Sequence, residues 1–209
     1  MEIISHRGFW NSENQKNSSF AFEQSFKEGF GTETDFRDFD GKLVISHDVA
    51  SANSELATSF FENYNASHCK GTLALNIKSD GLQNLILHEI KKHKLQQYFV
   101  FDMSVPDTLG YLKNEIIFFS RQSEYEMTPV FYEQATGIWL DSFETNWFDA
   151  NLILNHIQNG KKVAIVSSEL HKRNHDDLWF FLKNTELSKN KNLILCTDVP
   201  HMAKHFFNT

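Results

Sequence analysis

The sequence alternates between short apolar runs and longer amphipathic segments, and this alternation constrains the fold more than any other feature. The short runs are rich in β-branched and aromatic residues, and several are apolar almost throughout, which is typical of strands covered on both faces. We predict strands at Glu2–Ser5, Thr32–Phe36, Thr72–Lys78, Tyr98–Met103, Ile116–Arg121, Gly137–Asp141, Lys162–Ser167 and Leu193–Thr197. A ninth run, Lys42–Ser46, follows Asp40-Gly41 and is typical of a short hairpin partner of the second strand.

Between these runs, apolar residues recur at the spacing of an amphipathic helix. The predicted helices are Ser18–Glu28, Leu82–Lys94, Asp107–Lys113, Trp147–Gln158, Asp176–Asn184 and His201–Phe207. Strands that alternate with helices imply parallel pairing and right-handed crossovers. Eight such strands favour a closed (β/α)8 barrel, with short loops because the usual barrel has about 250 residues. We therefore expect an α/β protein with a single barrel domain over residues 1–209.

Composition narrows the possible partners. The chain has 20 basic and 27 acidic residues and a formal charge of −7, which disfavours a nucleic-acid binder because such a protein needs a basic face. No uncharged apolar run approaches the roughly 18 residues that cross a bilayer, so we expect no membrane insertion. The first residues lack the pattern of a secretory signal, and two cysteines cannot form a disulfide framework. We expect a cytoplasmic protein, and the sequence leaves its oligomeric state open.

Polar residues follow one predicted strand after another. The carboxyl ends of the strands of a (β/α)8 barrel meet at one mouth, where active sites lie. Because side chains two residues apart on a strand point the same way, Glu33 and Asp35 share a face, as do Asn76 and Lys78. Other strands are followed or ended by His6, Arg7, His47, Asp102, Arg121 and Asp141. A barrel interior also holds polar groups that serve packing alone, but their convergence at strand ends favours a functional site.

The order of short motifs in the first fifty residues resembles that of the glycerophosphodiester phosphodiesterases. The motifs are His6-Arg7-Gly8, Asn17-Ser18 leading into Ala21-Phe22, Glu33-Thr34-Asp35, Asp40-Gly41 and His47-Asp48; the match returns at Leu73–Lys78 and at Thr197-Asp198-Val199-Pro200. The resemblance implies a TIM barrel like that of phospholipase C, a divalent cation and hydrolysis of a phosphodiester. It also implies that His6 and His47 are the catalytic pair.

The chain departs from the family pattern at three places. Asn76 stands where the family has a glutamate that ligates the metal, so the site has one negative charge less. An amide oxygen still binds Mg²⁺ or Ca²⁺, and we expect weaker binding or help from a carboxylate such as Asp102. Lys16 replaces a glutamate of the family's helix-start motif. The insertion after His47-Asp48 is reduced to roughly Val49–Gly71, which bears on the substrate more than on the chemistry.

These residue types suit phosphodiester hydrolysis. A cation, held by the hard oxygens of Glu33, Asp35 and Asn76, would stabilise charge that develops on the phosphoryl oxygens. Arg7 offers a planar fork for two phosphate oxygens, and Lys78 adds a point charge. Two imidazoles can share the proton transfers because their pKa lies near neutrality. The sequence leaves open which histidine is the acid, and whether water or a neighbouring substrate hydroxyl attacks phosphorus.

The leading hypothesis is a metal-dependent phosphodiesterase that acts on a small glycerophosphodiester or a related soluble phosphodiester. Candidate contacts to the alcohol moiety are Asp102, Arg121, Glu124 and Asp141. One alternative, motivated by Asn76, is a barrel that binds a phosphorylated ligand without turnover. Another is a phosphodiesterase acting on a sugar- or nucleotide-linked phosphodiester in surface-polysaccharide metabolism. The presence of both histidines with Arg7, Glu33 and Asp35 argues against loss of turnover.

Overall fold

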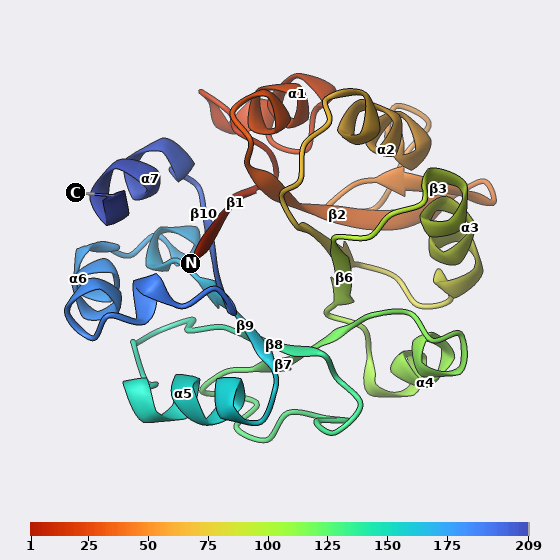
Figure 1. Cartoon of the computed structure of the whole chain (residues 1–209). Coiled ribbons are helices and arrows are strands. Elements are labelled where there is room, and N and C mark those ends of the chain that lie inside the picture. The colour runs from red at the N-terminus through yellow and green to blue at the C-terminus, as the bar shows by residue number, and fades with distance from the viewer. Residues whose placement is uncertain (209) are drawn as a thin grey trace. The chain divides into compact units, whose positions relative to one another are not determined.

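The computed structural model describes residues 1–208, which fall into two compact units. Figure 1 shows the helices and strands in chain order. The N-terminal unit comprises Ser5–Phe118, and the C-terminal unit comprises Met1–Ile4 together with the chain from Phe119 onward. Strand β1 (Glu2–His6) begins in the C-terminal unit and ends in the N-terminal one. Each unit has a parallel sheet, as the alternation of strands and helices predicted.

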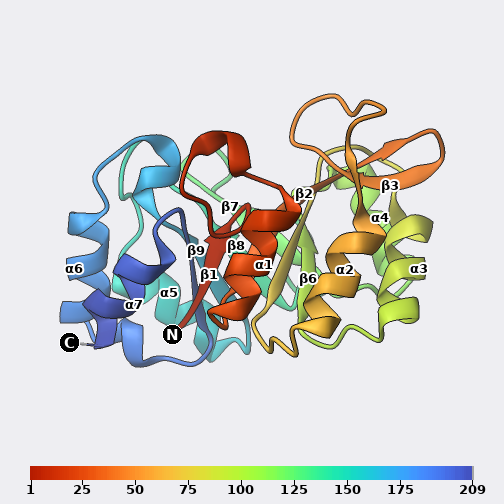
Figure 2. The ribbon, with the colours of Figure 1, turned by 90° about the horizontal axis from the view of Figure 1, so that it is seen from above.

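The N-terminal unit contains the parallel strands β2 (Gly31–Phe39), β5 (Leu73–Ile77) and β6 (Tyr98–Phe101). As predicted for the run after Asp40-Gly41, β3 (Lys42–Ile45) returns antiparallel to β2, and the short β4 (Glu55–Leu56) pairs with β3. The helices of this unit are α1 (Ser19–Lys27), α2 (Ala57–Ala66), α3 (Gln83–His93) and α4 (Val105–Lys113), with a 3-10 turn η1 at Glu13–Gln15. Figures 1 and 2 show α2 between α1 and α3.

Aromatic side chains fill the core between the helices and β2. Phe22 and Phe60 meet edge to face with ring centroids 4.7 Å apart, and Phe36 stacks on Phe61 at 5.7 Å. All four rings are buried. Ring pairs of this kind contribute about 0.5–1.5 kcal/mol beyond the burial of their surface. These phenylalanines therefore belong to the packed core that holds β2 in place.

Helix α2 corrects one sequence-based expectation, because the segment Val49–Gly71 is not a reduced insertion. Its central part, Ala57–Ala66, is the helix whose Phe60 and Phe61 fill the core just described, and only the loop 46–54 remains between β3 and β4. We did not predict α2 because Leu56 at its N-cap makes no side-chain cap and because Asn and Ser residues in and after the helix favour turns. Packing against α1 and α3 outweighs this weak local preference.

The C-terminal unit has parallel strands in the order β10–β9–β8–β7. The strands are β7 (Phe119–Gln122), β8 (Gly137–Leu140), β9 (Lys162–Val166) and β10 (Leu193–Thr197); the helices are α5 (Ala150–Gln158), α6 (Asp176–Asn184) and α7 (Pro200–Asn208), with 3-10 turns η2 (Ser168–His171) and η3 (Leu187–Lys189). Its core packs Ile138, Ile153 and Leu178 around the sheet. Two elements of this unit begin later than the sequence predicted. Strand β7 begins at Phe119 and not at Ile116, and α5 begins at Ala150, after its cap Asp149, and not at Trp147.

Parallel pairing is confirmed in both units, while closure of the strands into one barrel and the single-domain organisation stay predictions. Among the helices of residues 1–208, none has the length and apolar character needed to span a bilayer.

Candidate active site

The candidate site is built on the buried face of β2. Glu33 and Asp35 alternate along this strand with exposed fractions of only 2% and 0%. Parallel pairing of β2 with β5 sets Asp35 opposite Asn76. The Asn76 amide Nδ2 donates to Glu33 Oε1 over 3.2 Å. The spacing of two on each strand thus brings these three side chains together, as predicted.

The last residue of β1, His6, and the tight turn after it, which carries Arg7, lead to the same place. Arg7 adopts the left-handed conformation (φ 57°), and its N–H donates to the Glu33 carbonyl over 2.9 Å. Gly8 has φ +86°, and a Cβ there would lie 2.6 Å from Ala21 Cβ at the start of α1, so only glycine allows this approach. His6 Nε2 lies 3.8 Å from Glu33 Oε2, and Arg7 Nε lies 2.8 Å from Asp35 Oδ2.

Asn17 belongs to one of the motifs found in the sequence, but no role at the site was predicted for it. Its Nδ2 donates to Asp35 Oδ2 over 2.8 Å, and its Oδ1 accepts from the Thr34 hydroxyl over 2.8 Å. The Asn17 N–H also donates to the Arg7 carbonyl over 2.9 Å. Asn17 therefore fixes the Asp35 carboxylate and the turn that carries Arg7.

Lys78 and Asp102 extend the charged cluster from β5 and β6. Lys78 Nζ lies 3.4 Å from Asp35 Oδ1 and 3.8 Å from Asp102 Oδ2. Asp35 is thus flanked by two cationic side chains, Arg7 and Lys78. Of the four predicted contacts to the alcohol moiety, Asp102 is the one that the N-terminal unit contains.

Three buried oxygens in this cluster make no hydrogen bond: Glu33 Oε2, Asp35 Oδ1 and Asn76 Oδ1. A buried polar atom without any partner costs about 1–3 kcal/mol. Lys78 at 3.4 Å from Asp35 Oδ1 and His6 at 3.8 Å from Glu33 Oε2 compensate these oxygens only in part, so the group is suited to accept a cation. Burial, and next the Asp35 charge, raise the pKa of Glu33 to about 7 against the opposing effect of His6, Arg7 and Lys78. Within residues 1–208, no three His, Cys, Asp or Glu side chains are placed to hold a metal ion by themselves. In this cluster the third oxygen beside Glu33 and Asp35 comes from the Asn76 amide. The hard oxygens nevertheless fit Mg²⁺ or Ca²⁺ in chemical type.

His47 lies on the loop after β3, and Arg37 holds its backbone. The Arg37 guanidinium donates from Nε and Nη2 to the His47 carbonyl, each over 3.2 Å. The His47 ring is 47% exposed, and its Nδ1 lies 2.8 Å from Asp48 Oδ1. Arg37 was missed in the sequence, although the same spacing of two that selected Glu33 and Asp35 continues to it.

A cavity of about 500 Å³ lies between the segment that follows β1 and the loop that follows β3. Arg7, Lys16 and Asn17 line it from the turn after β1, and His47 and Asn53 line it from the loop after β3. The volume is within the range of about 300–1,000 Å³ for small-ligand sites. Arg7 and His47 therefore face one space that can hold a small molecule.

The other predicted contacts lie in the C-terminal unit, in hydrogen bonds and ion pairs of their own. Arg121 forms an ion pair with Glu126, and Glu124 Oε1 accepts from the Glu144 N–H over 2.7 Å. Asp141 Oδ1 lies 2.7 Å from His171 Nε2. The substrate contacts predicted for Arg121, Glu124 and Asp141 stay predictions.

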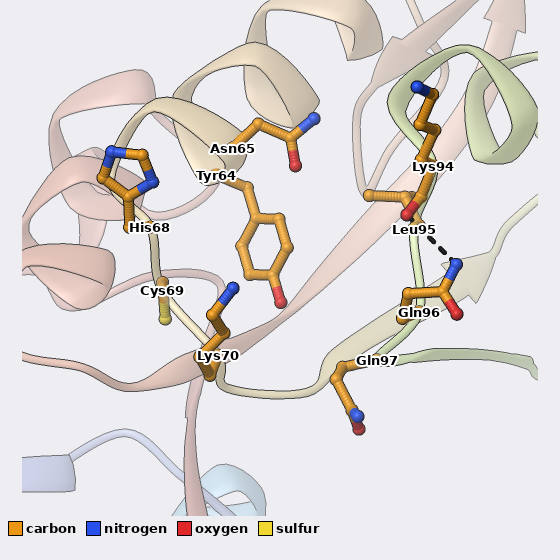
Figure 3. A pocket seen from close by; sticks show the side chains of 9 residues that line it. All are labelled: Tyr64, Asn65, His68, Cys69, Lys70, Lys94, Leu95, Gln96 and Gln97. Atoms are coloured by element: carbon orange, nitrogen blue, oxygen red, sulfur yellow. Dashed lines mark hydrogen bonds between the residues drawn. The ribbon is translucent and has the colours of Figure 1, made fainter.

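A smaller cavity of about 130 Å³ lies at the other end of the strands (Figure 3). It is lined by residues of the segments that precede β5 and β6, among them Tyr64, Lys70 and Gln97. The Tyr64 hydroxyl donates to the Gly71 carbonyl over 2.9 Å. Because ligands of parallel α/β sheets bind at the carboxyl ends of the strands, the larger cavity is the candidate substrate space, and Arg7 connects it to the cluster around Asp35.

Comparisons with known proteins identify the fold. No protein-family model matches the chain, and no curated protein sequence matches it. Solved structures do match in fold, and three of them are phosphodiesterases by name. An Oleispira antarctica phosphodiesterase, solved in complex with the product sn-glycerol-3-phosphate, superposes with a TM-score of 0.73 and 15% identity, covering 100% of this chain and 97% of that chain.

Two further structures are glycerophosphodiester phosphodiesterases by name. The enzyme from Agrobacterium tumefaciens has a TM-score of 0.71 and 13% identity, with 100% of both chains covered. The Parabacteroides distasonis protein has a TM-score of 0.67 and 13% identity, covering 99% of this chain and 86% of that chain. At such identities the likeness shows the fold, and the resemblance seen in the sequence motifs is confirmed at that level.

Proposed function

We propose that this protein is a metal-dependent phosphoric diester hydrolase that acts on a small glycerophosphodiester or a related soluble phosphodiester. The observation that carries the proposal is the group of three buried oxygens without hydrogen bonds, on Glu33, Asp35 and Asn76, beside His6, Arg7 and Lys78. The shared fold supports it, and the proposal includes closure of the strands into a (β/α)8 barrel.

The oxygens of Glu33, Asp35 and Asn76 would hold the divalent cation. When bound, the cation supplies positive charge to the phosphoryl oxygens and so favours attack on phosphorus. Arg7 and Lys78 add fixed positive charge beside Asp35, and the planar Arg7 guanidinium suits two phosphate oxygens. These groups bind and orient the diester before any proton moves.

His6 and His47 would transfer the protons. In this proposal Nε2 of His47 would face the substrate, with Asp48 beside Nδ1, and Arg37 holds the backbone of that residue. His6 is placed by the end of β1, with Nε2 toward Glu33. Positioned acid–base catalysis is worth about 10²–10⁴ in rate.

The test is cleavage of bis(p-nitrophenyl) phosphate with Mg²⁺, Ca²⁺ or EDTA. We expect turnover that EDTA abolishes and that His6→Ala lowers by at least about 100-fold. His205→Ala, an exposed position on α7, is the matched control and keeps wild-type turnover. If no divalent ion supports turnover while glycerol phosphate still binds, the protein is a binding module and the proposal is wrong.

A further inference from the structure

A second group of polar side chains lies where the loop after β5 meets the start of α4. Asp107, in the first turn of α4, accepts through Oδ1 from the Gly81 N–H over 2.9 Å and from the Gln83 side-chain amide. Ser104, the N-cap of α4, donates to Asp80 Oδ2 over 3.1 Å. These hydrogen bonds join the loop after β5 to the segment after β6.

Two atoms of this group are buried without a hydrogen bond, Asp107 Oδ2 and the Tyr111 hydroxyl. Tyr111 has an exposed fraction of 0% and lies one turn after Asp107 on α4. Helical side chains lean toward the N-terminus of their helix, so the Tyr111 ring leans toward the Asp107 carboxylate. Burial, and then the charges of Asp107 and Asp80, raise the pKa of Tyr111, so its hydroxyl stays protonated. Both atoms lack the partner that buried polar groups normally have.

The negative charge of this group is also without a cationic partner. Within residues 1–208, neither Asp80 nor Asp107 forms an ion pair. The positive end of the α4 dipole offsets the Asp107 charge only in part, and the donors from Gly81 and Gln83 reach only its Oδ1. A water molecule would bridge the two buried atoms but would leave the charge of the two carboxylates in place. A cation would satisfy both requirements.

We propose that Asp80, Asp107 and Tyr111 bind a divalent cation, Ca²⁺. The ligands are hard oxygens, from two carboxylates and a neutral hydroxyl, and water completes the shell on the exposed side of Asp80. Ca²⁺ accepts irregular sets of about six to eight oxygens, whereas Mg²⁺ requires near-ideal octahedral geometry. Within residues 1–208 no site has three acidic, His or Cys ligands, so we expect a Kd of only about 10⁻⁴–10⁻³ M here.

The cation would fasten two segments that reach the candidate active site. Lys78 lies two residues before Asp80, and Asp102 lies two residues before Ser104. Lys78 Nζ lies 3.8 Å from Asp102 Oδ2, so the same segments meet again in the charged cluster around Asp35. The proposal does not depend on the proposed function, because it concerns the stability of these segments and not turnover.

Thermal unfolding with and without CaCl₂ tests the proposal in Glu33→Gln, in which the candidate active site has lost a cation ligand. At about 10 mM CaCl₂ we expect the unfolding midpoint to rise by about 3–10 °C, as mass action predicts for this Kd. Adding Asp107→Asn should abolish the rise, although the amide oxygen can still accept from Gly81 and Gln83. Adding Tyr111→Phe instead removes only a hydroxyl and should reduce the rise.

Three controls accompany this measurement. Asp177→Asn is the matched variant, because Asp177 is likewise an acidic residue in the first turn of a helix, α6, and it should keep the full rise. NaCl at equal ionic strength should give a much smaller rise, because it screens charge without a site. MgCl₂ should give a smaller rise than CaCl₂ at the same concentration.

Two results would overturn the inference. A rise no larger than that in NaCl would assign the two buried atoms to a bridging water molecule. An equal rise with and without Asp107→Asn would place the ion elsewhere. Should Asp107→Asn fail to fold, the difference between Glu33→Gln with and without Tyr111→Phe decides the question in the same way. Absence of phosphodiesterase turnover would leave these outcomes unchanged.

Discussion

Two buried polar clusters, one in each unit, are built in opposite ways. Around His156 in the C-terminal unit, ring atom Nε2 lies 2.8 Å from Gln122 Oε1 and Nδ1 lies 3.0 Å from the Tyr132 hydroxyl. Gln122 in turn donates to the Met127 carbonyl over 2.8 Å. Around Glu33 in the N-terminal unit, three oxygens are buried without a hydrogen bond. A satisfied network specifies one packed structure, whereas unsatisfied buried oxygens are explained by a ligand.

The two clusters also differ in the direction in which burial shifts the pKa of the central titratable group. Burial, and then the nearby Lys161, lower the pKa of His156, so its neutral form fits the network. Burial and Asp35 raise the pKa of Glu33 to about 7. The folded protein thus keeps a neutral histidine in one cluster and holds a carboxylate that a cation would ionise in the other.

The largest effect should follow from removing the charge at the centre of the site. We expect Glu33→Gln to lower divalent-ion-dependent turnover by at least about 100-fold. Loss of a residue that only hydrogen-bonds a metal-ligating side chain typically costs about 10–100-fold, so a ligand itself should cost more. The amide keeps the shape of the side chain, so the far-ultraviolet circular dichroism should not change. Turnover near the wild-type rate would place the metal elsewhere and remove the contrast between the clusters.

The same variant should reveal a pH-dependent stability in the absence of divalent ions. The folded-state pKa of Glu33, about 7, lies above its ordinary value of 4.5, so the folded state binds more protons between these values. Its contribution is fully present below about pH 4.5 and is lost as pH rises through 7, by about 3 kcal/mol. Urea unfolding at pH 5 and pH 8 should show a steeper loss for wild type than for Glu33→Gln. Parallel curves would show that Glu33 is ionised in the free protein.

His156 should show the opposite sign. Because its pKa is lowered on folding, its contribution is present above the ordinary value of 6.5 and is lost as pH falls through the lowered folded value. His156→Leu removes the imidazole partner of Gln122 Oε1 and of the Tyr132 hydroxyl, and should cost about 1–3 kcal/mol at pH 8, and less at pH 5. Phosphodiesterase turnover, measured below the unfolding temperature, should stay near that of wild type. A large loss of turnover would show that this cluster also serves the reaction.

The smallest expected effect comes from adding a negative charge at position 76, where the chain has an amide. Asn76→Glu supplies a third carboxylate and should tighten Mg²⁺ binding several-fold, since affinity for hard cations follows the charge of the ligands. Isothermal titration with the ion alone measures this without turnover, and Asn65→Glu on α2 serves as the control. Equal affinity of Asn76→Glu and wild type would mean that residue 76 is not a ligand.

The regular elements were largely predictable because their signals are local. Apolar runs predicted β5, β9 and β10 within two residues at each end, and helical spacing predicted α6 at Asp176–Asn184, its observed bounds. Helix α2 escaped prediction because its stability comes from contacts with α1 and α3, which are distant in sequence. Local propensity is a weak signal where packing dominates.

In the candidate site, too, local signals were predictable from the sequence and long-range contacts were not. The sequence was sufficient to place Glu33 with Asp35 and Asn76 with Lys78, because a strand repeats every two residues and parallel strands end at one edge. It was not sufficient to show that Asn17 fixes Asp35 or that Arg37 holds His47. Those contacts join separate segments across turns in the left-handed conformation, as at Arg7 and Asn17, and no periodic pattern encodes their direction. Long-range packing sets such directions, and with them which buried oxygens are left for a ligand.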